Sequence, residues 1–105
     1  MAYNMKKDDN PLVSVIIGTY NRSELISRCL DSVFNQTYKN IEAIVIDDKS
    51  TDNTLQILKK YKLKFPSNFK YVSNNTNKGI AYNSNLAFSL AKGDFFALIG
   101  DDDEW

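Results

Sequence analysis

Short β-branched, apolar runs alternate along this chain with segments whose apolar residues recur at helical spacing. The strand-like runs are residues 12–17, 41–46, 69–73 and 94–99. The helix-like segments are residues 23–35, a stretch that starts near 52 and ends within 63–68, and residues 80–91. Strands that alternate with helices pair in parallel through right-handed crossovers. The chain is therefore predicted to be an α/β protein with three α/β/α layers and a mainly parallel sheet.

Polar side chains follow three of the four predicted strands at the points where those strands end. Thr19, Tyr20 and Asn21 follow the first strand, Asp47 and Asp48 follow the second, and Asp101–Asp103 follow the fourth. In an open parallel sheet, ligands bind outside the carboxyl ends of the strands. These residues are therefore expected to gather at one edge of the sheet.

The acidic run Asp101–Asp103 contains the strongest candidate metal ligands. Three adjacent carboxylates repel one another unless water screens them or a cation neutralises them. Their hard oxygens suit Mg²⁺ or Mn²⁺, which also bind phosphate oxygens. The run indicates a site for one of these ions, and a solvated acidic turn is the alternative.

Two further groups could contact a nucleotide. The pair Asp47 and Asp48 could bind a ribose hydroxyl or a base, or could place negative charge near the start of the second helix. Tyr20 could stack on a base, with Thr19 and Asn21 beside it. Its alternative is packing, with Asn21 or Ser23 capping the first helix.

The turn before the third helix contains Lys78 and Gly79. Lys78 could reach a phosphate, or the turn could serve only to start the helix. The sequence contains neither G-x-G-x-x-G nor G-x-x-x-x-G-K-[ST]. The usual dinucleotide-binding fold and the P-loop NTPases are therefore disfavoured.

Composition excludes other classes. Thirteen basic residues balance thirteen acidic ones, which argues against nucleic acid as a partner. No histidine is present, and the one cysteine, Cys29, lies on an apolar helical face where packing is its expected role. Residues 1–10 are expected to be a flexible tail without a signal peptide, and 11–105 one domain. A cytoplasmic location is expected, while membrane association of the full-length protein stays open.

Several segments together resemble the family 2 glycosyltransferases, which have the GT-A fold. The resemblance covers residues 12–105. It rests on VSVIIGTYN, a Q-T-Y segment, IDDKSTDNT, NKG, AYN, AKGD and the final acidic run before Trp105. Motifs in this order are more specific than any one of them.

The resemblance implies roles for individual residues. Tyr20 would lie by the nucleobase, and Asp48 would bind the base or ribose. The acids of the D-x-D element would hold the metal and, through it, the diphosphate. The chain departs from the family pattern at Gly18, Tyr82 and Gly100. Gly100 stands where the first acid is usual, so Asp102 and the pair Asp101 and Asp103 remain alternative ligands.

The implied activity is transfer of a sugar from a nucleotide diphosphate sugar, a UDP-sugar, to a hydroxyl acceptor with inversion. The catalytic base is expected downstream of Trp105, so we expect the 105 residues to be an incomplete domain with little activity alone. An exposed sheet edge could support a homo-oligomer. A non-catalytic nucleotide-binding or interaction module on the same fold is the alternative. A receiver-like signalling domain is disfavoured, because its acids would follow other strands.

Overall fold

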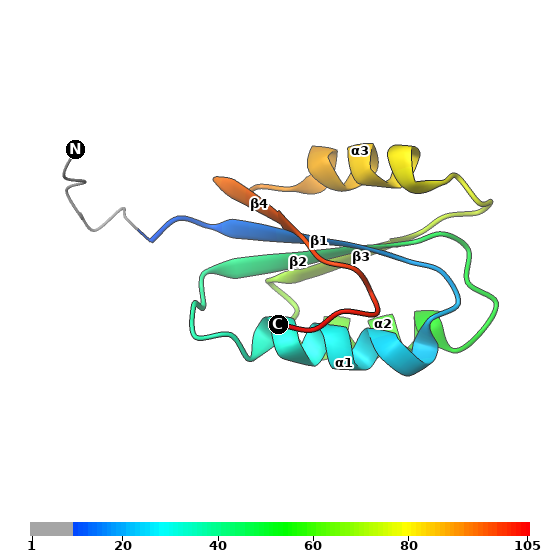
Figure 1. The fold of residues 1–105 in the computed structure, drawn as a ribbon, viewed down its shortest axis with the longest axis horizontal. Helices are drawn as coiled ribbons and strands as arrows, with labels where there is room; N and C mark the ends of the chain where they lie inside the picture. The colour runs from blue at the N-terminus through cyan, green and yellow to red at the C-terminus, as the bar shows by residue number, and fades with distance from the viewer. Residues whose placement is uncertain (1–9) are drawn as a thin grey trace.

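The computed structural model describes residues 10–105, so nearly all of the predicted tail lies outside the described residues. Four strands and three helices alternate along the chain, as predicted (Figure 1). They are β1 (Val13–Thr19), α1 (Ser23–Phe34), β2 (Ile41–Asp47), α2 (Thr54–Lys64), β3 (Phe69–Ser73), α3 (Ile80–Leu90) and β4 (Phe95–Leu98).

The four strands form one parallel sheet in the order β3-β2-β1-β4. β1 lies between β2 and β4, and the chain crosses from one side of β1 to the other through α3. The carboxyl ends of β1 and β4 therefore border the point where the direction of strand addition reverses. Sheets of this kind bind ligands at that point.

β1 is longer than predicted. The predicted strand stops at residue 17, before Gly18, but Gly18 pairs with Ile46 and Thr19 pairs with Asp47. A glycine weakens a strand without preventing it from pairing. The added residues carry β1 as far as the last residue of β2, which brings Thr19 to the same edge as Asp48.

The two faces of the sheet are covered unequally (Figure 1). α1 and α2 lie on one face, over a large core that includes Val15, Ile17, Leu30 and Phe69. α3 lies alone on the other face, over a smaller core of Ile16, Ile44, Ile46 and Ala87. The predicted three-layer arrangement is confirmed, and the thinner cover on the α3 side leaves room beside that helix.

A buried polar network fastens the α3–β4 connection to the amino ends of β1 and β2. The Glu42 carboxylate accepts hydrogen bonds from Ser14 Oγ and the Lys92 backbone N–H, both at 2.6 Å, and pairs with Lys70 Nζ at 3.1 Å. The Gly93 N–H donates to Ser14 Oγ at 2.9 Å. Glu42 is only 5% exposed, so its charge depends on these partners.

The same network explains Gly93, which lies two residues beyond the predicted third helix, where a glycine often ends a helix. The helix ends at Leu90, and its cap, Ala91, has extended backbone angles. A Cβ atom on Gly93 would lie 2.4 Å from Ser14 Oγ and 2.9 Å from the Leu12 carbonyl oxygen. The glycine is therefore required for close approach to β1, and not as a helix stop.

β4 is an edge strand with an apolar surface. Phe95, Phe96 and Leu98 are 61%, 49% and 63% exposed. Such an edge can pair with another chain, so self-association through β4 stays a prediction. Within residues 10–105, no helix has the length and apolar character needed to cross a bilayer.

Candidate functional site

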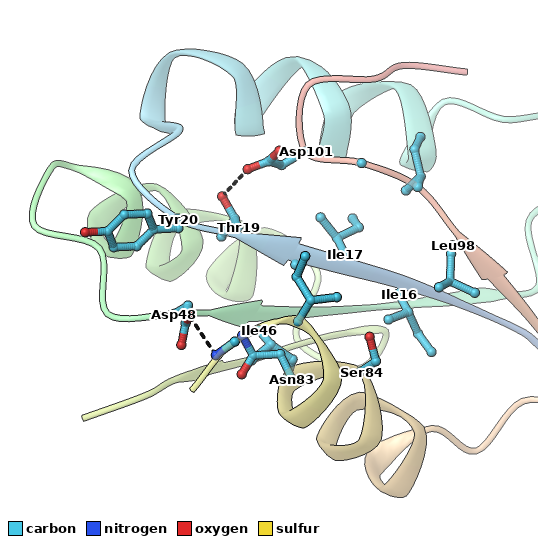
Figure 2. A pocket seen from close by; sticks show the side chains of 15 residues that line it. Ile16, Ile17, Thr19, Tyr20, Ile46, Asp48, Asn83, Ser84, Leu98 and Asp101 are labelled. Carbon is cyan, nitrogen blue, oxygen red and sulfur yellow. Dashed lines mark hydrogen bonds between the residues drawn. The ribbon is translucent and has the colours of Figure 1, made fainter. Parts of the chain in front are cut away.

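A cavity of about 450 Å³ opens at the carboxyl edge of the sheet, between β1, β4 and the start of α3 (Figure 2). β1, β2 and β4 all contribute to its walls. Its lining includes the following predicted site residues and their neighbours: Gly18, Thr19, Tyr20, Ile46, Asp48, Gly79, Leu98, Gly100 and Asp101. Residues that are far apart in the sequence thus meet at the edge where the site was predicted.

Thr19 joins the ends of all three strands. Its hydroxyl donates to Asp101 Oδ2 at 2.8 Å, as Figure 2 shows, and its carbonyl accepts from the Asp48 N–H at 2.9 Å. Thr19 is only 4% exposed, so its main role is to connect β1 to the residues that follow β2 and β4 through these hydrogen bonds. Tyr20, the next residue, is 48% exposed and lines the cavity.

Asp48 holds the segment that leads into α3. Its Oδ1 accepts from the Lys78 N–H at 2.7 Å and from Asn74 Nδ2 at 3.0 Å, and its Oδ2 accepts from the Gly79 N–H at 3.2 Å. The Lys78 N–H contributes most to lowering the pKa of Asp48 to about 2, although desolvation opposes it. Asp48 is therefore ionised at neutral pH and lines the cavity.

Asp47 faces the opposite side of the sheet. It is fully buried, and its oxygens accept from the Ser50 N–H, the Ser50 hydroxyl and, at 3.1 Å, the Ser73 hydroxyl. The protein's own donors thus occupy this carboxylate, which shapes the loop after β2. The expectation of a ligand contact rests on Asp48 rather than on Asp47.

Lys78 and Gly79 differ in their relation to the cavity. The Lys78 ammonium lies 5.4 Å from the centre of the Tyr82 ring, and its side chain is not among those that line the cavity. Gly79 lines the cavity, and its φ of +87° lies in the region that favours glycine. The turn therefore supplies a glycine corner to the site, while a phosphate contact of Lys78 stays a prediction.

Asn21 links two loops instead of capping α1. Its Oδ1 accepts from the Thr51 N–H at 2.7 Å, and its own N–H donates to Ser50 Oγ at 2.8 Å. Its φ is +51°, a conformation that asparagine tolerates better than most residues. These bonds fix the backbone beside Tyr20.

The prediction that Asn21 or Ser23 caps α1 is wrong. Arg22 is the capping residue and makes no side-chain cap. Asp52, from the loop after β2, instead accepts from the Ser23 N–H at 3.1 Å, and its other oxygen accepts from the Thr54 N–H at 3.0 Å. One carboxylate therefore serves the first turns of α1 and α2, which sequence spacing alone does not reveal.

Replacing Asp52 by alanine is expected to lower the free energy of unfolding by about 2 kcal/mol, because a lost cap costs about 1 kcal/mol and two helices share this one. Urea denaturation measures the change. Asp52→Asn should lose about 1 kcal/mol, because the amide has one acceptor oxygen and can keep only one of the two caps. An alanine variant within about 0.5 kcal/mol of wild type would contradict the shared cap.

The Asp52 carboxyl also titrates unusually. Partial burial would raise its pKa, but hydrogen bonds from Thr54 and Ser23 outweigh burial and lower the pKa to about 2. A carboxyl whose pKa is lowered on folding stabilises the fold above its unfolded pKa of 3.8 and loses that effect as pH falls toward 2. The double cap is therefore intact at neutral pH.

The acidic turn after β4 offers carboxylates of the kind that Mg²⁺ and Mn²⁺ bind. Gly100 has no side chain, and Asp102 Oδ1 and Asp103 Oδ2 each lie 2.9 Å from the point that a Cβ there would occupy. Asp101 bonds to Thr19 at the cavity. The donor chemistry thus fits a hard divalent cation.

The geometry limits how many ligands the chain itself supplies. Within residues 10–105, no three acidic or cysteine side chains converge as a ready-made metal centre. A cation at the turn would need oxygens from a bound phosphate or from water, as is usual for Mg²⁺. Asp102 and the pair Asp101 and Asp103 therefore remain alternative metal ligands, as in the prediction from sequence.

The negative field of the turn reaches α1. Burial, followed by the nearby carboxylates of Asp101, Asp103 and Asp102, raises the pKa of the Cys29 thiol to about 11. The thiol stays protonated and lies 3.5 Å from the Gly100 carbonyl oxygen. Cys29 is thus an inert packing residue, as predicted, at the back of the turn.

Sequence reasoning missed several cavity residues on α3. Asn83 lies 8% exposed and accepts from Asn74 Nδ2 at 2.7 Å, and Ser84 follows it along the wall (Figure 2). Ile80, the first residue of α3, also lines the cavity and is 87% exposed. Asn83 shares its helical spacing with the apolar Ile80, Ala87 and Leu90, and a polar residue at that spacing was the signal that could have identified this wall.

Comparisons with known proteins agree with the geometry. The family model described as glycosyl transferase family 2 matches residues 14–105. UDP-Glc:alpha-D-GlcNAc-diphosphoundecaprenol beta-1,3-glucosyltransferase WfaP of Escherichia coli is 44% identical over 90% of this chain, which spans 36% of WfaP. The chain thus spans about a third of that relative.

Two solved structures share the fold. The mannosyltransferase PcManGT from Pyrobaculum calidifontis, in complex with GDP-Man and Mn²⁺, has a TM-score of 0.83 and 31% identity, covering 90% of this chain and 28% of that one. S. aureus TarS 1-349, in complex with UDP-GlcNAc, has a TM-score of 0.80 and 38% identity, covering 88% and 27%.

The family match extends over nearly the whole described chain and includes each strand end that lines the cavity. The structural neighbours are glycosyltransferases with the GT-A fold, in agreement with the parallel sheet and its helical layers. This chain belongs to glycosyl transferase family 2.

Proposed function

We propose that this chain binds a nucleotide diphosphate sugar, a UDP-sugar, together with Mg²⁺ or Mn²⁺, and that the protein transfers the sugar to a hydroxyl acceptor with inversion. The observation that carries the proposal is the cavity where Tyr20, Asp48 and Asp101 meet at the carboxyl edge. The named substrates of WfaP and the UDP-GlcNAc complex of TarS support a uridine donor.

The base end of the nucleotide fits beside Tyr20 and Asp48. The half-exposed Tyr20 ring offers a face for stacking at the rim. An ionised carboxylate has about four acceptor positions, and three protein donors already bond to Asp48. The remaining position can accept a base imide or a ribose hydroxyl.

The diphosphate end fits by the turn after β4. Asp101, Asp102 and Asp103 are the residues that would hold the cation, with the phosphate oxygens completing its shell. A cation there would stabilise the negative charge that develops on the departing diphosphate. The Mn²⁺ complex of PcManGT supports a divalent ion.

The acceptor and the catalytic base are not assigned to any residue of this chain. Inversion requires a base that deprotonates the acceptor hydroxyl as it attacks the anomeric carbon. The lipid-linked diphosphate in the name of WfaP supports a glycan acceptor class for this family member. The donor half of the reaction is therefore the part that can be tested on these residues.

Calorimetric titration with UDP, with and without Mn²⁺, tests the donor site. Wild type is expected to bind UDP at least about tenfold more tightly with Mn²⁺ than without it, because a cation bridges two anionic groups. Asp102→Ala should remove that gain, and Tyr20→Ala should weaken binding with and without the metal. GDP in place of UDP reports on the preference for the base.

Glu24→Ala, on the exposed first turn of α1, is a matched control for loss of one carboxylate. It should bind UDP as wild type does. Folded protein that binds neither UDP nor GDP at millimolar concentration would overturn the proposed donor site, and binding that ignores Mn²⁺ would overturn the metal.

A further inference from the structure

The segment after β4 lies along α1 rather than extending into solvent (Figure 1). It is attached at several points. The Cys29 thiol contacts the Gly100 carbonyl, and the backbone N–H of Trp105 donates to Ser32 Oγ at 3.1 Å. Between Gly100 and Trp105, the segment is also contacted by Arg22, which pairs with Asp102, and by Arg28, which contacts Asp102 and Glu104.

Arg22 forms an ion pair with the carboxylate of Asp102, which is a predicted metal ligand. Arg22 Nη1 lies 3.6 Å from Asp102 Oδ2, and the two side chains are 47% and 54% exposed. Asp102 Oδ1 lies 2.9 Å from the point that a Cβ on Gly100 would occupy, and Asp103 Oδ2 lies at the same distance from that point. One oxygen of Asp102 thus faces the guanidinium, and the other faces the place where the carboxylates gather.

Arg28 contacts the same turn in a different way. Its Nη2 donates to the Asp102 backbone carbonyl at 3.4 Å, and its Nε lies 3.7 Å from Glu104 Oε1. Arg28 therefore contacts the backbone of the turn and the residue beyond the carboxylate cluster. It makes no ion pair with Asp101, Asp102 or Asp103 in the part of the chain that the structure describes.

We propose that the two arginines divide the control of the metal site: Arg28 holds the acidic turn on α1, and Arg22 neutralises Asp102 until a divalent cation displaces it. The inference rests on the proposed function, since it concerns the same cation. An exposed ion pair contributes little to stability, so Arg22 can exchange for a doubly charged ion at small cost.

Two substitutions with equal charge change separate the roles. Arg22→Gln removes the counter-ion, and Mn²⁺ is expected to bind about fivefold more tightly without nucleotide, from the lost repulsion at short range. Arg28→Gln removes the same charge from a side chain that contacts the Asp102 backbone carbonyl at 3.4 Å and makes no ion pair with its carboxylate. It should not tighten Mn²⁺, because the freed turn no longer presents its carboxylates together.

Electron paramagnetic resonance measures the concentration of free Mn²⁺ and so gives the Mn²⁺ dissociation constant of each arginine variant without any turnover.

Trp105 is the single tryptophan of the chain, so its fluorescence emission reports whether the segment after β4 stays on α1. Arg28→Gln should shift that emission to the red and increase quenching by acrylamide. Arg22→Gln should leave it unchanged. Arg22→Lys keeps the charge and should bind Mn²⁺ within about twofold of wild type. Lys60→Gln, on exposed α2, is the charge-matched control.

The outcomes are distinct. Tighter Mn²⁺ binding for Arg22→Gln alone, with Trp105 released only in Arg28→Gln, supports the inference. Equal tightening in both arginine variants would reduce the effect to bulk charge and overturn it. So would an Arg22→Gln protein that binds Mn²⁺ like wild type. If neither wild type nor any variant binds Mn²⁺, even with UDP present, the metal of the proposed function fails as well.

Discussion

Replacing Phe69 by alanine is expected to lower the free energy of unfolding by about 4 kcal/mol, from the usual cost of deleting a buried aromatic side chain. Phe69 begins β3 and is fully buried. Its ring centre lies 6.2 Å from those of Phe34 and Tyr61 and 6.1 Å from that of Tyr71. The substitution would leave a cavity among three rings that come from both helices of that face and from β3.

Urea denaturation, monitored by circular dichroism, measures this loss of stability. A domain of this size is stable by only about 5–15 kcal/mol, so the variant should be close to its unfolding threshold. Phe95→Ala removes the same side chain at a position that is 61% exposed, and it should cost less than about 1 kcal/mol. Equal costs at the two positions would show that Phe69 is not central to the core.

Replacing Glu42 by alanine is expected to cost about 3 kcal/mol, because removing one member of a buried ion pair leaves its partners without compensation. The Lys70 ammonium would lose its carboxylate, and the Lys92 N–H and Ser14 hydroxyl would lose their acceptor. The α3–β4 connection should then loosen from β1. Hydrogen exchange at the Gly93 amide would report that loosening.

Glu42 also predicts a dependence on pH. Burial opposes ionisation, but bonds from Ser14, Lys92 and Lys70 outweigh it and lower the pKa below 4.5. The group therefore stabilises the fold above pH 4.5 and loses that effect as the solution is acidified below it. Glu42→Gln should lack this part of the acid sensitivity. A Glu42→Ala protein as stable as wild type would show that the network is dispensable.

The sequence predicted the type and order of all the elements because apolar spacing depends only on local geometry. β3 has the predicted bounds, Phe69–Ser73, since turn-forming Pro, Ser and Asn residues flank a short run that contains Phe69, Tyr71 and Val72. The extension of β1 through Gly18 could not be predicted in this way. It depends on the length of β2, the strand beside it.

Residues that act over long sequence distances were the hardest to predict. Gly93 has the spacing of a helix stop, yet its role depends on Ser14, 79 residues away. Asp52 has the spacing of a cap for α2, and its bond to Ser23 depends on how two loops pack. Each case needs a contact that only the assembled sheet creates.

The candidate site was predicted in outline, because parallel strands bring their carboxyl ends to one edge. Tyr20, Asp48, Gly79 and Asp101 do meet there. The direction of individual side chains was not predictable from order alone. Asp47 is the last residue of β2 and is fully buried, whereas Asp48, the next residue, lines the cavity.

The strand order has a consequence for folding during synthesis. β1, β2 and β3 are neighbours in the sheet and leave the ribosome in that sequence, so they can pair as soon as residue 73 is available. The free side of β1 must then wait until Phe95–Leu98 emerges. During that interval β1, an inner strand of this four-strand sheet, is an open edge, to which a chaperone or another nascent chain could bind.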